Sequence, residues 1–165
     1  MMKYKKILKR AKLKKTNYRK RRSMLMNKSD FVTVKISNEN TLVQIHKPVF
    51  TGDLVVASAH SRFLINEGWK GSRKNISAAY LTGYLAGKKS IIKGIKHVIL
   101  YSGTDKYTQR MAAALKGLID AGLQIPADSH TFPTEQRING AHLSVKNNIE
   151  SIKSIINKGQ KNEQK

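Results

Sequence analysis

Residues 31–59, FVTVKISNENTLVQIHKPVFTGDLVVASA, carry the clearest structural pattern in the chain. Residues 31–37 alternate apolar and polar side chains and are rich in β-branched types, which is typical of a half-buried strand. Residues 41–49 and 54–59 repeat the pattern, and we expect the second strand to be cut at Pro48, because proline has no N–H for the ladder. Since only short polar turns separate the three segments, they predict an antiparallel three-strand meander.

Helical and strand patterns alternate after the meander. In order, they predict a helix over residues 75–92, a strand over 97–101, a helix over 108–121, a brief strand over 123–125, and helical segments over 134–141 and 145–156. Asn75 or Ser77 can cap the first helix, whose apolar residues share one face, and Gly122 ends the second helix. A meander followed by such alternation predicts the α/β class, with a mixed sheet packed against helices.

Positive charge is concentrated at the N-terminus. The 165 residues hold 32 Lys plus Arg and 10 Asp plus Glu, a net charge of +22, and 13 of the basic residues precede the first acid, Asp30. We therefore expect a basic arm over residues 1–28, one α/β domain over 29–158 and a disordered polar tail over 159–165. The arm has apolar residues at helical spacing, but crowded like charges destabilise a free helix, so we expect it to stay unfolded until a polyanion binds.

The composition argues against several kinds of site. There is no Cys, which excludes disulfides, thiolate zinc sites and Cys nucleophiles, and no stretch approaches the roughly 18 apolar residues of a membrane span. The histidines lack i+3 or i+4 partners, and the acids occur singly rather than in close pairs. Residues 83–90, GYLAGKKS, resemble a phosphate-binding loop but have the wrong spacing and lie inside a predicted helix. We expect no catalysis, cofactor, metal or small-molecule substrate.

The excess charge indicates a polyanionic partner, because a chain with a net charge this far from zero repels itself. From the residues alone three interpretations stay open: a structural RNA-binding protein, a general basic RNA-binding or RNA-processing protein, and a DNA- or membrane-binding basic protein. An enzyme lacks clustered acids for metal ions, and the arm has no Trp or Phe for insertion into a membrane, so we expect no membrane partner.

A series of short motifs narrows the choice. In order they are ASAHS at residues 57–61, GW at 68–69, SAAYLTG at 77–83, LAG at 85–87, DAGL at 120–123, IP at 125–126, QR at 136–137 and GAH at 140–142. Over most of residues 9–142 the chain thereby resembles the large-subunit ribosomal protein eighteen family, in its archaeal and eukaryotic-type form. The resemblance implies a non-catalytic, cytoplasmic constituent of the large ribosomal subunit. It implies that the protein binds 5S rRNA, contacts large-subunit rRNA, and anchors the 5S rRNA in the central protuberance beside large-subunit ribosomal protein five.

The resemblance also implies where RNA is bound, namely on the basic arm and on the open face of the early strands. Carried onto this chain, the candidates are Lys9, Arg10, Lys14, Lys15, Tyr18, Arg21 and Arg22 in the arm, and Lys35, Ser37 and Asn38 on the sheet. One departure concerns the first hairpin turn, where the family usually has Arg or Lys and then His after Ser-Asn. This chain has Glu39 and Asn40 there, and we expect Glu39 to repel phosphate.

Overall fold

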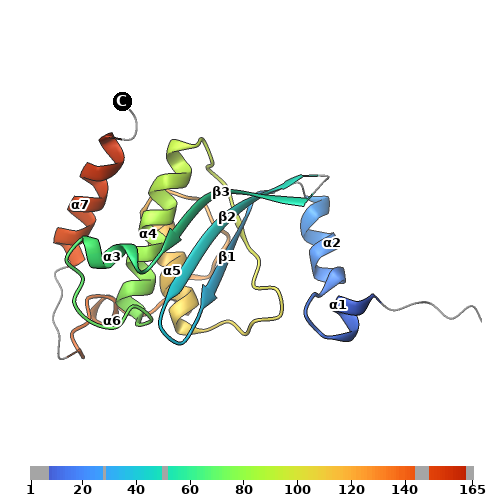
Figure 1. The fold of residues 1–165 in the computed structure, drawn as a ribbon, viewed down its shortest axis with the longest axis horizontal. Helices are drawn as coiled ribbons and strands as arrows, with labels where there is room; N and C mark the ends of the chain where they lie inside the picture. The colour runs from blue at the N-terminus through green and yellow to red at the C-terminus, as the bar shows by residue number, and fades with distance from the viewer. Residues whose placement is uncertain (1–7, 28, 50–51, 144–148, 163–165) are drawn as a thin grey trace, which may run out of the picture.

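The computed structural model describes residues 8–27, 29–49, 52–143 and 149–162 (Figure 1). Its first three strands form an antiparallel meander: β1 (Phe31–Ile36), β2 (Thr41–Val49) and β3 (Gly52–His60). A fourth strand, β4 (Ile99–Leu100), pairs with β1 in parallel, and the sheet order is β3-β2-β1-β4. The predicted α/β fold, with a mixed sheet that begins as a meander and packs against helices, is confirmed.

Two long helices pack against the sheet. Helix α4 (Ile76–Ile92) contacts β2 and β3, and α5 (Gln109–Asp120) contacts α4 and β1. The other helical elements are α1 (Lys9–Lys12), α2 (Tyr18–Met26), α3 (Phe63–Asn66), the 3-10 turn η1 (Ser129–Thr131), α6 (Glu135–Ile138) and α7 (Ile149–Asn162). None of the helices in the described ranges is both long and apolar enough to cross a membrane.

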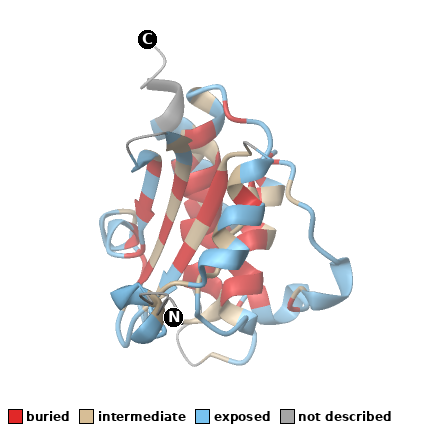
Figure 2. Cartoon of the chain, turned by 90° about the vertical axis from the view of Figure 1, so that its right-hand side faces the viewer, coloured by how far each residue is buried: buried red, intermediate tan, exposed pale blue. Residues whose placement is uncertain are grey.

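The core lies between the sheet and these helices. In the middle of the meander, alternate strand residues point towards the helices and are at most 3% exposed: Val32, Val34, Val43, Ile45, Ala57 and Ala59. Figure 2 shows the buried residues concentrated where strands and helices face each other. Because side chains alternate along a strand, the residues between them lie on the opposite face of the sheet. That opposite face is where the candidate site begins.

Local capping signals hold in the structure, but the burial of α4 goes beyond its pattern. Of the two predicted caps for α4, Asn75 is the one used, since its side chain accepts a hydrogen bond from the Ala78 N–H at 2.7 Å. Thr108, which is not among the predicted caps, caps α5 by accepting from the Met111 N–H at 3.4 Å. The sequence predicts one apolar face on α4, yet α4 is buried without interruption from Ser77 to Gly87. Helix α4 contacts the sheet, α5, α6 and α7, so it is covered on several sides. Its small residues are therefore buried as well as its apolar ones.

The crossing of α4 and α5 depends on two glycines. A Cβ atom added at Gly83 would lie 2.1 Å from the Ala114 carbonyl oxygen, and one added at Gly117 would lie 2.1 Å from the Tyr80 carbonyl oxygen. Both neighbours are backbone atoms, which cannot turn aside as a side chain can. Residues 83–90, excluded above as a phosphate-binding loop, therefore have a packing role at their first glycine.

The predictions near β4 were wrong in extent. The strand covers Ile99–Leu100 rather than residues 97–101. In the parallel register Phe31, the first residue of β1, pairs with Ile99, so residues 97 and 98 have no β1 residue to pair with. Residues 123–125 form no strand but a single bridge, between His97 and Gln124. Pro126 follows two residues later and has no N–H with which to extend that ladder.

Other boundaries also differ. Strand β2 continues through Pro48, which pairs with Asp53 of β3. On the other side of β2, the pairing with β1 ends at His46, so Pro48 has no neighbouring strand on that side and its missing N–H is tolerated. Helix α6 is shorter than residues 134–141, and part of the predicted helix over 145–156 lies outside the described residues. Helix α7 runs to Asn162, past the predicted tail boundary at Gly159, because Ile149, Ile152 and Ile156 bury an apolar stripe.

Candidate nucleic-acid interface

The face of the sheet that points away from α4 carries mostly polar side chains in register. Across the meander, Thr33, Gln44 and Ser58 form one row, and Lys35, Leu42 and His60 form the next. These six side chains are half-buried or exposed, and we call them the open face. Lys35 therefore lies on the side of the sheet that the resemblance assigns to RNA.

Lys35 forms an ion pair on this face. Its Nζ lies 2.6 Å from a carboxylate oxygen of Asp105, and the two side chains are 60% and 42% exposed. Exposed ion pairs of this kind stabilise a protein by about 0–1 kcal/mol. The Lys35 ammonium therefore loses little if it leaves Asp105 for a phosphate.

The turn after β1 is closed by Ser37. The Ser37 N–H donates to the Asn40 carbonyl at 2.8 Å, and the Ser37 Oγ accepts from the Asn40 N–H at 2.9 Å. Both polar groups of Ser37 are thus occupied within the turn, whereas the Asn38 side chain is exposed at its tip. Of the two turn candidates, Asn38 has its side chain free of the hydrogen bonds that the described residues of the turn form, whereas the Ser37 hydroxyl shapes the turn.

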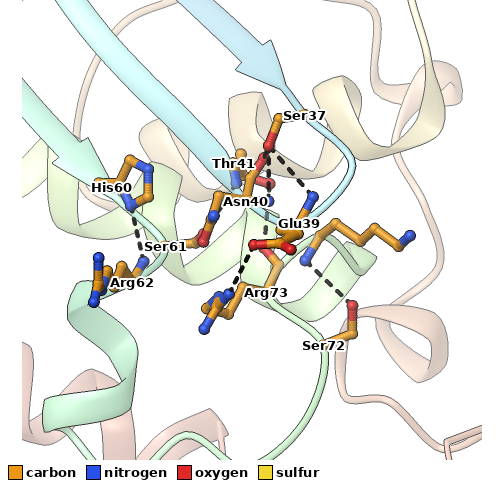
Figure 3. Close-up of polar contacts among 10 residues, drawn as sticks. Ser37, Glu39, Asn40, Thr41, His60, Ser61, Arg62, Ser72 and Arg73 are labelled. Carbon is orange, nitrogen blue, oxygen red and sulfur yellow. Dashed lines mark hydrogen bonds and ion pairs between the residues drawn. The ribbon is translucent and has the colours of Figure 1, made fainter.

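An arginine from a distant loop reaches the same turn (Figure 3). The Arg73 guanidinium lies 3.5 Å from the Glu39 carboxylate, and the Arg73 carbonyl accepts from the Thr41 hydroxyl at 3.4 Å. The charge of Glu39, expected to repel phosphate, is therefore offset by Arg73. Sequence reasoning missed Arg73, although residues 70–74, KGSRK, hold three basic residues and no acid.

The ASAHS motif ends in a residue with a structural task. The Ser61 Oγ accepts from the Thr41 N–H at 2.9 Å, and the Ser61 N–H donates to the Thr41 carbonyl at 2.9 Å (Figure 3). Ser61 is fully buried, and these bonds tie the end of β3 to the first residue of β2, which follows the turn after β1. The same end of the sheet holds the exposed side chains of His60 and Arg62.

The described part of the arm packs against the body at the other end of β1. Met24 of α2 is 7% exposed, and the Lys20 Nζ donates to the Ser102 Oγ at 3.1 Å. Arg21 binds both carboxylate oxygens of Asp53 in β3, at 2.7 and 2.6 Å. The hydrogen bond to Asp53 raises the pKa of Arg21 above its ordinary value, despite partial burial. A cleft of about 480 Å³ remains between α2 and β4, lined in part by Lys20 and Tyr101.

Local bonds shape the arm itself. The Asn17 side chain caps α2 by accepting from the Lys20 N–H at 3.1 Å, and the Arg10 Nε donates to the Thr16 hydroxyl at 2.9 Å, which joins α1 to the start of α2. Of the apolar residues at helical spacing, those that precede Leu8 lie outside the described residues, and Ala11 alone lies within α1. That the arm stays unfolded until a polyanion binds remains a prediction for the residues before α2. For α2 itself, the contacts of Arg21 and Met24 with the body favour a helix that is already ordered in the free protein.

Most arm candidates remain open to a partner. Lys9, Lys14, Lys15, Tyr18 and Arg22 are exposed, and within the part of the chain that the structure describes none of the four cations forms an ion pair. Arg21 is the exception, since its guanidinium is held by Asp53. The candidates therefore form two groups, one on the arm and one near the turn. Strand β1 runs between the end of the arm and the turn, and its six residues span roughly 20 Å at about 3.3 Å per residue.

His46 lies between the arm and the open face. Its ring stacks on Phe31 with ring centres 4.9 Å apart, and its Nε2 lies 2.9 Å from the Thr33 hydroxyl. Burial lowers the pKa of His46 below its ordinary value, and the nearby Arg21 lowers it further while Asp53 acts in the opposite direction. The ring is therefore held neutral at neutral pH.

Known proteins resemble this sequence over most of its length. A sequence profile of the family described as "Ribosomal large subunit proteins 60S L5, and 50S L18" matches residues 2–109. The chain belongs to this family. It is 40% identical to the large ribosomal subunit protein uL18 of Thermofilum pendens over 139 aligned residues. These residues make up 83% of this chain and 71% of the relative. The chain is 41% identical over 140 residues to the uL18 of Aeropyrum pernix, covering 83% of this chain and 65% of the relative.

Membership confirms the resemblance found in the motifs. A further uL18, from Methanothermobacter thermautotrophicus, is 38% identical over 142 residues, which cover 85% of this chain and 74% of the relative. As a member of the family, the protein is a structural, rRNA-binding component of the large ribosomal subunit in the cytoplasm, and not an enzyme. The family therefore decides against the RNA-processing interpretation.

Proposed function

We propose that this protein binds 5S rRNA and anchors it in the central protuberance of the large subunit, beside large-subunit ribosomal protein five. The observation that carries the proposal is the pairing of an exposed basic arm with an open sheet face, in a member of a large-subunit ribosomal protein family. Strand β1 runs between the end of the arm and the turn, and candidates spread in this way suit a structured RNA better than a short single strand.

The arm is proposed to supply most of the affinity. Lys9, Arg10, Lys14, Lys15 and Arg22 neutralise phosphates, and each contact releases counterions. Such contacts fix the position of the RNA but do not distinguish one RNA from another. Tyr18, which is 39% exposed, can stack on an unpaired base, and the cleft beside β4 offers space for another.

The turn group is proposed to supply selectivity. Asn38 offers an amide with donors and an acceptor to base edges or 2′-hydroxyls, while Ser37 holds the turn that carries it. Lys35 and Arg73 lie on either side of the turn, each paired with an exposed acid that a phosphate can replace, and Arg73 is proposed to take the place of the basic turn residue that the family usually has. In this assignment Ser37 acts on the RNA through Asn38.

The test compares 5S rRNA with a structured RNA of equal length and unrelated sequence. The full chain should bind 5S rRNA at least about tenfold more tightly, about 1.4 kcal/mol, at physiological salt. Asn38→Ala should reduce this preference, whereas Lys14→Gln should weaken both complexes alike. Equal binding of the two RNAs would contradict the proposal and favour a general basic RNA-binding protein. Recovery of one complex with 5S rRNA and ribosomal protein five tests the remaining partner.

A further inference from the structure

The contact between the arm and the body contains an acid whose position is unexpected. Asp53 lies beside a helix that we propose binds RNA, where its negative charge opposes phosphate. Its carboxylate binds one terminal nitrogen of Arg21 through both oxygens, at 2.7 and 2.6 Å. Both side chains are only about one-quarter exposed, at 26% and 24%. Charge-assisted bonds of this length and burial are stronger than ordinary surface pairs.

Helix α2 needs such a contact to hold its place. It has nine residues, four consecutive cations from Arg19 to Arg22 and no acid, and a helix this short is unstable in water on its own. Met24 is its one buried residue. Among the ion pairs that the described residues form, only Arg21–Asp53 joins the arm to the body.

We propose that Arg21 is a positioning residue, whose ion pair with Asp53 holds α2 against β3 and so fixes the direction in which the arm presents its exposed cations to RNA. The proposal rests on the proposed RNA-binding function. The neighbouring Arg22 is exposed on the same helix, while Tyr18 lies one turn earlier. A fixed α2 spares the RNA the entropic cost of ordering these side chains at the moment of binding.

The proposal makes a prediction of unusual sign for Asp53→Asn. Removing an acid from a protein that binds a polyanion ordinarily tightens binding. Here Asp53→Asn should weaken 5S rRNA binding about three- to tenfold, because the amide no longer holds the guanidinium. Glu67→Gln is the matched control: it removes one negative charge at the end of α3, which follows the end of β3 that is far from α2 (Figure 1). It should leave binding unchanged or slightly tighter.

Two further measurements distinguish a failure of the Arg21–Asp53 proposal from a failure of the proposed RNA-binding function. Amide hydrogen exchange in the free protein should show reduced protection of residues 18–26 in Asp53→Asn but not in Glu67→Gln. The charge swap Arg21→Asp with Asp53→Arg should restore both protection and RNA affinity, because it rebuilds the pair with its direction reversed. Unchanged protection, or RNA binding as tight as in the wild type, for Asp53→Asn would overturn the proposal. If the wild-type chain shows no preference for 5S rRNA, the proposed function fails instead, while the exchange data still test the ion pair.

Discussion

At the scale of single residues, two acids stand within the basic surface and each has an arginine partner. Glu39 pairs with Arg73 at 3.5 Å and is 75% exposed, so that pair contributes little to stability. Asp53 pairs with Arg21 at 2.6 Å and is 24% exposed, so that pair is less screened by water. The two acids therefore differ in their effect. Glu39 lowers the local positive charge at Arg73, whereas Asp53 holds helix α2 in place.

His46 leads to a prediction about pH. Its pKa in the folded protein is below the ordinary value of about 6.5, so the unfolded chain takes up the proton first as pH falls. The contribution of the neutral ring to stability is complete above about pH 6.5 and is lost as pH falls from there through the folded-state pKa. Urea unfolding between pH 7.5 and 5 should show this decline for the wild type and a smaller one for His46→Gln.

A second variant tests whether burial of the His46 ring or its contact with Thr33 causes this pH dependence. Thr33→Val removes the hydroxyl that lies 2.9 Å from the His46 Nε2 but keeps the ring and its burial. Because burial is the main cause of the lowered pKa, Thr33→Val should keep the decline in stability at low pH. The same slope in His46→Gln as in the wild type would show that another group is responsible.

At the scale of elements, the crossing of α4 and α5 is the most demanding contact. Gly83→Ala places a methyl group 2.1 Å from a backbone oxygen of Ala114, and neither helix can yield locally. Overpacking of this kind costs about 1–3 kcal/mol or more, so the free energy of unfolding should fall by at least about 2 kcal/mol. Urea denaturation measures the change.

Gly159→Ala is the matched control for the helix crossing. Gly159 lies in α7, is exposed, and has no atom within 4 Å of an added Cβ among its described surroundings. Alanine should therefore raise the free energy of unfolding by about 0.5–1 kcal/mol, because glycine is the poorer helix former. A Gly83→Ala protein as stable as the wild type would show that the two helices separate without cost.

Helix α7 illustrates how an element gains partners that its own pattern does not reveal. Lys153 lies over the ring of Tyr80, with its Nζ 4.7 Å from the ring centre, and the Tyr84 hydroxyl donates to the Asn157 side chain at 2.9 Å. Burial and the hydrogen bond to Asp120 raise the pKa of Tyr80, so its hydroxyl stays protonated as a donor. The apolar stripe brings α7 to α4, and these polar contacts fix its rotation.

At the scale of the whole molecule, the division of charge predicts how RNA binding responds to salt. The net charge of +22 divides into +13 on residues 1–28 and +9 on the remainder. Each phosphate contact adds about 0.7–0.9 to the slope of log affinity against log salt. Deleting residues 1–28 should therefore weaken 5S rRNA binding by orders of magnitude and flatten the slope. Filter binding across a salt series measures both.

A second variant keeps the fold intact while it tests the same point. Substituting Lys9, Lys14, Lys15 and Arg22 by Gln removes four exposed cations and leaves Met24 and the Arg21–Asp53 pair in place. The slope should fall by about 3, which is four contacts at 0.7–0.9 each. An unchanged slope would mean that the RNA does not contact the arm.

Much of this architecture follows from local sequence. Alternation from Phe31 to Ile36, the caps at Asn75 and Thr108, and the cluster of charge before Asp30 depend on residues a few positions apart. The resemblance to the ribosomal family also came from short motifs in order. The short β4 was beyond such reasoning, because its length depends on where β1 begins across the sheet.

The sequence by itself determined the class of fold, the basic arm and the family, because each is written in neighbouring residues or in ordered motifs. Only the tertiary structure decided that Arg21 faces Asp53, that Arg73 faces Glu39, and that Gly83 meets α5. The partners in the two ion pairs are 32 and 34 residues apart in the chain. Electrostatic and steric forces act through space over a few ångströms, so only the folded chain brings such residues together.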